Sequence, residues 1–245
     1  MRIAFILALI LLVFGCKKSE YRNCVKSIGT IDAKEIILDD FDKLYMGPHL
    51  RYKLVQSTVN KVVINGGANL LNGIDAHVDG GKLLIENKND CAFLRPYDEI
   101  VEVEIHFVNI INIEFEGTNE VLCPDTIQAT DLTLLIRDGA GAFDLKIDAN
   151  SLNLVISHGW GNYNVRGDVN FATFQISSNG FGNSNDLNVS TELIVISNSA
   201  GLLEVNSSNC LFQAEINSVG NINYIGIPTI LNYNRYGSGD LIDKN

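Results

Sequence analysis

A short glycine-rich turn, usually Gly-x-Gly, recurs about every twenty residues along the second half of this chain. Each turn separates two short runs in which apolar and polar residues alternate. Successive turns are 22, 20, 21, 19, 19 and 19 positions apart, and their last residues are Asn119, Gly141, Gly161, Gly182, Gly201, Gly220 and Gly239. A period this regular indicates a stack of nearly identical structural units.

The alternation on either side of each turn predicts a half-buried strand. Apolar residues occupy every second position from Leu132 to Ile136 and again from Phe143 to Ile147, as in a strand with one face on a core. Glycine suits the turns because it reaches positive φ at little steric cost. With two strands per twenty residues, the pattern predicts an all-β fold, a single-stranded parallel, right-handed β-helix or solenoid with about 20 residues per coil.

An antiparallel β-sandwich is the alternative fold, because it also places many short strands between frequent turns. The solenoid is favoured since the same turn chemistry returns only after every second strand. A calcium-binding nonapeptide solenoid is excluded because its motif is approached only once, at Gly237–Asp240. Beyond the first residues no segment sustains a helical apolar period, so almost no helix is expected.

Composition is ordinary for one or two globular domains. The chain has 245 residues, of which 46% are hydrophobic and 19% are charged, enough for a sizeable core. Its net charge of −11 argues against a nucleic-acid partner, because phosphate binding requires basic residues. No Pro- or Ser-rich linker interrupts residues 24–245, so we expect a single domain with less regular coils over 24–116 and regular coils over 117–245.

The N-terminus predicts export. A positive start is followed by the twelve apolar residues Ile3–Phe14, too few to span a bilayer but suited to a signal peptide. The sequence L-V-F-G-C, ending at Cys16, resembles a bacterial lipobox. We therefore expect a signal peptide over residues 1–15, lipidation of Cys16 with a tether over 16–23, and anchoring of the protein to the cell envelope, at the outer membrane. An ordinary cleaved signal is the alternative.

Export makes the other four cysteines candidates for disulfide bonds. Cys123 and Cys210 lie four coils apart, about 19 Å along a stack of strands, whereas a disulfide needs Cα atoms within about 7 Å. They should therefore not be bonded to each other, and Cys210 shares the inward alternation of its neighbours. Cys24 and Cys91 lie outside the repeat and are expected to pair; two free thiols are the alternative.

The order of several motifs resembles that of the auto-transporter adhesin head GIN-domain family, exported and lipoprotein-like chains of Bacteroidetes-type bacteria. The matching motifs are F-D-K-L at Phe41–Leu44, V-V-I-N-G-G-A-N-L-L-N-G-I at Val62–Ile74, D-G-G-K-L-L-I-E-N-K at Asp79–Lys88 and I-N-Y-I-G-I-P at Ile222–Pro228. The resemblance spans roughly residues 24–245 and implies an adhesive role without established functional residues. Lipoprotein members of the family also carry cysteines at places matching Cys24 and Cys91.

Together these features predict a non-catalytic, lipid-anchored cell-envelope protein, an adhesive or structural binding module with no cofactor. A carbohydrate-active β-helix enzyme, a polysaccharide lyase or glycosidase, is the alternative, since parallel β-helices host such enzymes. Candidate carboxylates are Asp138, Asp144, Asp148, Asp168 and Asp186, but their offsets from the turns place no two on one face with certainty. The histidines (His49, His77, His106 and His158) are isolated, so no metal site is predicted.

The turns themselves supply the candidate binding residues. Trp160 and Phe181 stand between the glycines of successive turns, where they would form an exposed aromatic step for a glycan or a surface protein. Nearby amides that could add hydrogen bonds are Asn162, Asn164, Asn183 and Asn185. Alternatively, the N-terminal strands or another subunit cover this corner; the sequence leaves the oligomeric state open. Asp125–Ile127 resembles an O-glycosylation acceptor of Bacteroidetes-type bacteria, with Thr126 as the candidate residue.

Overall fold

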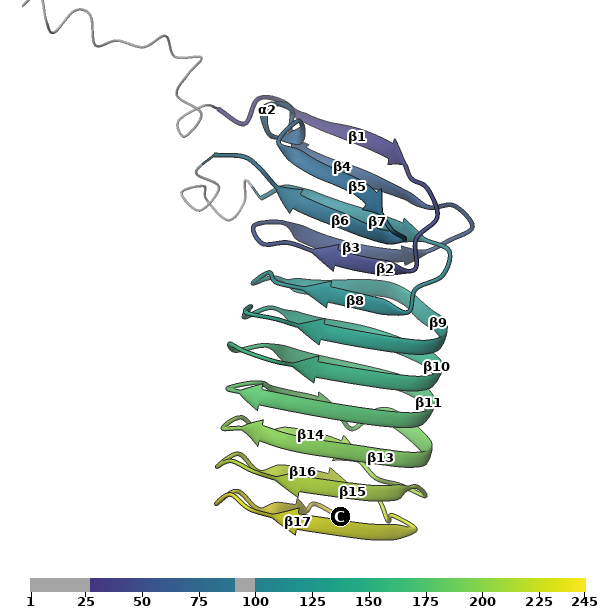
Figure 1. Ribbon diagram of the computed structural model, residues 1–245, viewed down its shortest axis with the longest axis vertical. Helices are drawn as coiled ribbons and strands as arrows, with labels where there is room; N and C mark the ends of the chain where they lie inside the picture. Colours follow the sequence, from purple (N-terminus) through teal and green to yellow (C-terminus); the bar gives the residue numbers. More distant parts are fainter. Residues whose placement is uncertain (1–26, 91–99) are drawn as a thin grey trace, which may run out of the picture.

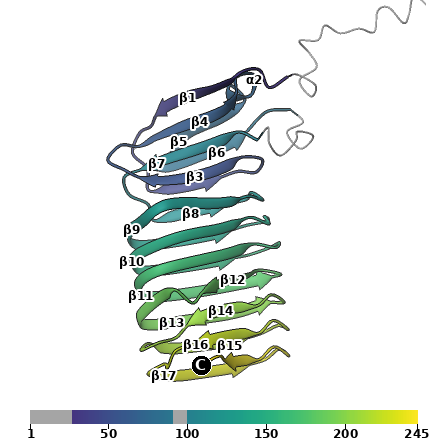
Figure 2. The ribbon, with the colours of Figure 1, turned by 180° about the vertical axis from the view of Figure 1, so that it is seen from behind.

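The chain forms a stack of β-coils, as the turn period predicts (Figures 1 and 2). The computed structural model describes residues 27–90 and 100–245. Strand accounts for 65% and helix for 2%, and the stacked parallel coils have about 20 residues per turn. The prediction of an all-β parallel solenoid is therefore confirmed.

The elements run from β1 at one end of the stack to β17 and β18 at the other, with β2 and β3 placed between β6 and β7 on one side and β8 and β9 on the other (Figure 1). Within the described residues they are β1 (Ile31–Ile37), β2 (Lys43–Met46), β3 (Arg51–Gln56), β4 (Lys61–Gly67), α2 (Ala68–Leu71), β5 (Ile74–Asp79), β6 (Lys82–Asn87), β7 (Glu102–Phe107), β8 (Asn112–Phe115), β9 (Glu120–Ile136), β10 (Ala142–Ile156), β11 (Asn162–Ser178), β12 (Phe181–Ser184), β13 (Leu187–Ser199), β14 (Leu203–Asn206), β15 (Leu211–Ile216), β16 (Ile222–Ile225), β17 (Ile230–Arg235) and β18 (Leu241–Asp243).

The regular coils begin at β9, and each pairs in parallel with the next. The long strands β9, β10 and β11 wrap around one side of the stack, opposite the glycine turns (Figure 1). Their second halves continue as a layer through β13, β15 and β17. Their first halves continue as the other layer through β12, β14, β16 and β18. The bend and the turns therefore form the two edges of a flattened tube.

The core is a set of columns in which equivalent residues stack from coil to coil. One column contains Leu132, Leu152, Ala172, Leu193 and Phe212, which are neighbours in the strand register and all buried. Burying one large apolar side chain contributes about 1.5–3 kcal/mol. Because the period of a strand is two, the residues between them face outward and are free to carry function.

The N-terminal end departs from the parallel pattern. Strand β4 pairs antiparallel with β1 and β7, and β5 and β6 form an antiparallel hairpin. Gly80 and Gly81, with φ of 55° and 77°, make its two-residue turn, as the D-G-G sequence predicts. Strand β2 pairs in parallel with β6 and β8, and β3 pairs in parallel with β7 and β9. These two strands therefore join the mixed sheet to the regular coils. The region is thus a mixed-sheet start of the same stack.

The periodic glycines are required for a different reason from the one that the sequence suggested. Among the described glycines of the Gly-x-Gly turns from Gly139 to Gly239, only Gly159 has positive φ, at 92°. A Cβ on Gly201 would lie 2.2 Å from the carbonyl oxygen of Gly180, and one on Gly239 would lie 2.1 Å from that of Gly220. Neighbouring backbones therefore approach too closely at the turns for any side chain.

The cysteines within the described residues behave as predicted. Cys123 and Cys210 are free and buried, which confirms that they are not bonded to each other. Burial raises the pKa of both thiols, so each acts as a small apolar residue of the core. Cys16, Cys24 and Cys91 lie outside the described residues.

Candidate functional site

The stack brings two of the five candidate carboxylates together. Asp148 on β10 and Asp168 on β11 are direct neighbours in the register of adjacent coils, and both side chains are exposed. Adjacent parallel strands are about 4.8 Å apart. The turn offsets alone place no two of the candidate carboxylates on one face, and the structure corrects that interpretation for this pair.

The other three candidate carboxylates lie elsewhere. Asp138 is in a turn, with positive φ, and faces the exposed His158 at 3.5 Å. Asp144 forms an ion pair with Arg166 and accepts a hydrogen bond from Asn164. A third, Asp186, is exposed in the turn after β12. None of these three joins the Asp148–Asp168 pair.

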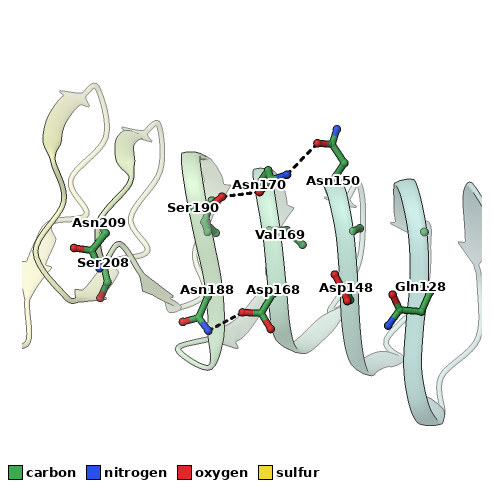
Figure 3. A pocket seen from close by; sticks show the side chains of 13 residues that line it. Gln128, Asp148, Asn150, Asp168, Val169, Asn170, Asn188, Ser190, Ser208 and Asn209 are labelled. Atoms are coloured by element: carbon green, nitrogen blue, oxygen red, sulfur yellow. Dashed lines mark hydrogen bonds between the residues drawn. The ribbon is translucent and has the colours of Figure 1, made fainter.

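The pair lies in a shallow groove of about 550 Å³ at the bend of the coils (Figure 3). We call it the polar groove; it crosses the successive coils and is lined by Gln128, Ala129, Asp148, Ala149, Asn150, Asp168, Val169, Asn170, Asn188, Val189, Ser190, Ser208 and Asn209. Each of four coils supplies a polar residue, a small apolar residue and, in three of them, a second polar residue. The groove thus has two polar rims and an apolar floor.

Hydrogen bonds run along both rims, from coil to coil (Figure 3). On one rim, Asn188 donates to Asp168 at 3.0 Å. On the other, Asn170 donates to Asn150 at 3.2 Å, and Ser190 donates to Asn170 at 2.7 Å. These bonds fix the orientation of the amides, because each amide oxygen that accepts a bond sets the direction of its own NH₂ group.

Asp148 keeps its full capacity to accept hydrogen bonds. Within residues 27–90 and 100–245 its carboxylate has no hydrogen-bond or ion-pair partner. It stands beside the carboxylate of Asp168, and like charges at directly opposed positions destabilise a sheet. Hydrogen bonds donated by hydroxyl groups of a ligand would offset that repulsion.

The backbone around the polar groove is held by specific contacts. The side chain of Gln56 clamps the backbone of Gln128, with Nε2 donating to its carbonyl at 2.9 Å and Oε1 accepting from its N–H at 2.8 Å. Gly167, immediately before Asp168, has φ of 115°, and a Cβ there would lie 2.1 Å from the carbonyl oxygen of Ile147. The close approach of these coils sets the spacing of the two carboxylates.

The environment of the carboxylates is unlike that of a glycosidase. Such an enzyme shields one carboxyl group from water so that it can act as an acid, whereas Asp148 and Asp168 are both exposed. Across the part of the chain that the structure describes, no group of three or more His, Cys, Asp or Glu side chains could hold a metal ion. The exposure of the two carboxylates is therefore not the environment that glycosidase chemistry requires.

The aromatic residues predicted to bind are exposed at the turns. Trp160 is 63% exposed and Phe181 is 41% exposed. Their relative placement differs from the prediction, since Phe181 begins β12 and pairs with Asn162, while Trp160 precedes Asn162 in the turn. Ring contacts among the described aromatics do not join the two. We call Trp160 and Phe181 the turn ridge.

The amides beside the turn ridge are mostly engaged. Asn183 donates to Glu204 at 3.2 Å and accepts from the backbone N–H of Asn185 at 2.8 Å. Asn164 donates to Asp144, and Asn162 is half-buried beside Phe181. The turn ridge therefore offers exposed aromatic surface with few free amides.

The sequence of this chain matches the model of a known protein family. A family model described as "Putative auto-transporter adhesin, head GIN domain" matches residues 40–228. The chain belongs to the head GIN-domain family. This confirms the resemblance carried by the sequence motifs. Comparison with curated proteins gives no match.

Solved structures share the fold of this GIN domain. One, from Bacteroides fragilis and described as a putative adhesin, is 20% identical with a TM-score of 0.75, covering 87% of this chain and 97% of its own. A putative lipid binding protein from Parabacteroides distasonis is 17% identical, with a TM-score of 0.66 and coverage of 89% and 98%. A putative adhesin from the same species is 16% identical, with a TM-score of 0.61 and coverage of 88% and 97%.

The family and the architecture fit a non-catalytic surface binding module of the cell envelope. No helix within residues 27–90 and 100–245 is long and apolar enough to cross a membrane. The predicted lipidation of Cys16 and the predicted Cys24–Cys91 disulfide fall outside the described residues. They remain predictions from the sequence.

Thr126, the predicted O-glycosylation residue, lies at an irregularity of the GIN domain. The register between β9 and β10 shifts here, so that Leu122 and Thr126 face Asp144 and Lys146. Four residues on β9 thus correspond to two on β10, and Pro124 and Asp125 in the resulting bulge are exposed. The bulge also accounts for the longest turn step, 22 residues.

Sequence reasoning missed the polar groove, although a signal for it was present. The tripeptides Q-A-T, D-A-N, D-V-N and N-V-S begin at Gln128, Asp148, Asp168 and Asn188, at intervals of 20 residues. A polar–small–polar pattern that recurs at the coil period predicts a continuous polar strip on the surface. The turn period alone does not reveal this second, equally regular repeat.

Proposed function

We propose that this GIN domain is a lipid-anchored, non-catalytic adhesive module of the cell envelope that binds its ligand in the polar groove. The observation that carries the proposal is the groove itself, with two coil-spaced polar rims and the unpartnered Asp148 carboxylate (Figure 3). Trp160 and Phe181, exposed on the turn ridge, form a second contact surface. Support for adhesion comes from the family to which the chain belongs.

The anchor is tested apart from the binding. Cells that produce the full chain are fed a palmitate analogue that carries a clickable group, and the envelope is fractionated. We expect the label on the protein and the protein in the outer membrane, because acyl chains hold it by burying CH₂ groups. Cys16→Ala should remove the label. Label that persists in this variant, or no label on either protein, would overturn lipidation at Cys16.

Binding is tested with beads that carry the full-length protein, passed over an array of immobilised glycans and extracellular proteins. Asp168→Lys places a bulky cation in the polar groove and should abolish retention. Trp160→Ala with Phe181→Ala should fold normally and weaken retention. Unfolding of the double variant would show that the turn ridge is part of the core, and retention untouched by Asp168→Lys would show that the groove is not the site.

The same beads are assayed for new reducing ends and unsaturated products on the retained glycans. Retention without turnover supports an adhesive module. Turnover that disappears in Asp148→Asn or Asp168→Asn would instead establish the carbohydrate-active alternative. The proximity of these two carboxylates is the one observation that favours that alternative, and their exposure argues against it.

We propose Thr126 as an O-glycosylation site on the basis of its position beside the exposed bulge. Modification there would project from the stack without disturbing the core, because Thr126 is only half-buried. Protein purified from the native host should show a glycan mass that Thr126→Val eliminates. An unmodified mass for the native protein would contradict the proposal.

A further inference from the structure

We infer that the ligand of the polar groove is a neutral, linear polysaccharide that lies along the stack with about one sugar residue per coil. This inference rests on the proposed function, because it names the ligand class of the same site. It is carried by the direction of the groove, the spacing of its side chains, their hydrogen-bonding character and the sign of their charge (Figure 3).

The direction of the groove excludes compact ligands. It crosses five successive coils, from Gln128 on β9 through β10, β11 and β13 to Asn209. Equivalent positions on adjacent coils are aligned, as shown by the pairing of Asp148 with both Gln128 and Asp168, and of Asp168 with Asn188. A long chain laid across the coils meets a similar set of groups at every step.

The spacing selects among extended polymers. Equivalent groups in the groove recur at about 4.8 Å, the separation of neighbouring strands. In an extended peptide, side chains on one face recur only every second residue, at about 6.6–6.8 Å, so a peptide falls out of phase with the coils. The sugars of an extended linear polysaccharide advance by a distance close to the strand separation. Each sugar carries hydroxyl groups on both edges of its ring, so every coil can meet a hydroxyl even where successive rings are flipped.

The hydrogen-bonding groups call for hydroxyls. Asp148 and Asp168 can only accept, the amides of Asn150 and Asn170 both donate and accept, and Ser190 carries a hydroxyl. A ligand that satisfies all of them must itself donate and accept at each step, as a polyhydroxylated chain does. The residues between the two rims, such as Ala149, are small and nearly buried, so no bulky side chain stands between the rims where the sugar rings would lie.

The charge excludes acidic polymers. Two carboxylates line the polar groove and no Lys or Arg does. Uronate or sulfate groups would be repelled, and so would nucleic-acid phosphates. No aromatic side chain lines the groove either, so each sugar contributes little, and attachment of a cell would depend on many anchored copies binding at once.

The experiment measures length dependence with full-length protein in a detergent that has no sugar headgroup. Titration calorimetry is carried out with cello-, manno- and chitin-oligosaccharides of two to six sugars, and with oligogalacturonides of the same lengths. We expect at least one neutral series to bind, with affinity rising up to about five sugars and then levelling off, because the groove spans five coils. The oligogalacturonides should not bind, and EDTA should have no effect.

Matched variants separate the groove from the general surface. Asn170→Ala should lower the affinity for the neutral ligand by about fivefold, the usual effect of one lost hydrogen bond. Gln175→Ala, which removes an exposed amide on the same strand but outside both the groove and the turn ridge, should not change binding. Asp148→Asn with Asp168→Asn preserves shape and removes charge, so it should retain neutral ligands and begin to admit oligogalacturonides.

The failures are distinguishable from one another. If the bead array shows groove-dependent retention but no neutral series binds, or affinity ignores length, the inference falls and the adhesive function stands. Binding that EDTA abolishes would point to a cation between the carboxylates and overturn it too. If the array retains no beads and no oligosaccharide binds, the proposed adhesive function fails together with this inference.

Discussion

Tyr163 is a residue whose hydroxyl has no hydrogen-bond partner within the described chain. Its side chain is 1% exposed, and desolvation raises its pKa far above the ordinary value of 10.0. The ring is nevertheless well placed, packing against Phe174 with centroids 5.5 Å apart. The ring therefore stabilises the fold while the buried hydroxyl lowers its stability.

We predict that Tyr163→Phe keeps or increases stability, by up to about 1 kcal/mol, because it removes an unsatisfied polar atom. Tyr52→Phe is the matched control, since Tyr52 is equally buried but donates to the carbonyl of Gly47 at 2.9 Å. That variant should lose about 1–2 kcal/mol. Urea denaturation measures both. A clear loss in Tyr163→Phe would indicate a buried water bound to the hydroxyl.

The turn is the element that fixes the distance between coils. Gly159 meets two constraints there: a positive φ and the close approach of a neighbouring backbone. Its φ is 92°, and a Cβ there would lie 2.3 Å from the carbonyl oxygen of Gly139. Gly80 also has positive φ, but nothing lies within 4 Å of its Cβ position. A side chain at Gly80 would therefore cause conformational strain alone, whereas one at Gly159 would cause both strain and steric overlap.

Gly159→Ala should destabilise the protein by more than about 2 kcal/mol, because strain and overlap add, whereas Gly80→Ala should cost about 1 kcal/mol from strain alone. Thermal unfolding followed by circular dichroism compares them. Equal losses in the two variants would show that the stack can relax at its turns, contrary to the close approach seen there.

Strands β3 and β7 are joined on their outer face by a charged cluster. Glu104 accepts from Lys53 at 2.7 Å and lies 2.7 Å from His106. The hydrogen bond from Lys53, with a smaller contribution from His106, lowers the pKa of Glu104 below its ordinary value of 4.5. A lowered pKa in the folded state means stability that is present above pH 4.5 and is lost as the pH falls through the folded pKa.

Glu104→Gln should therefore reduce the slope of unfolding free energy against pH below pH 4.5. Glu102→Gln, an exposed residue of the same strand, is the control and should leave that slope unchanged. Urea titrations at pH values between 2.5 and 6 supply the measurement. An unaltered slope in Glu104→Gln would assign the acid sensitivity to other carboxylates.

At the scale of the whole molecule, the stack sorts its cysteines into two classes. Cys123 and Cys210 are buried, and burial raises the pKa of their thiols, so neither should react with a thiol reagent until the protein unfolds. Cys24 and Cys91 are predicted to pair and should react only after reduction. Peptide mapping without reduction identifies the bond, and labelling of Cys24 or Cys91 in unreduced protein would refute it.

The sequence was sufficient for the architecture because a solenoid is almost one-dimensional. Each coil contacts only its neighbours, so one local pattern repeated at a fixed period determines strands, stacking and the inward columns together. Leu132 and Leu152 could be assigned to the core in this way, and so could Cys210. The same reasoning showed that Cys123 and Cys210 cannot be bonded, because the distance across four coils is several times the Cα separation that a disulfide allows.

Only the tertiary structure decided what lies beside what on the surface. The bulge at Pro124 and Asp125 and the early start of β12 at Phe181 each shift the register, so equal distance from a turn does not guarantee contact. Asp148 and Asp168 share such a distance and do meet, whereas Trp160 and Phe181 do not pair. The sequence by itself determined the period of the stack, which is set by local alternation; the structure decided the polar groove, because neighbours across coils depend on every irregularity between them.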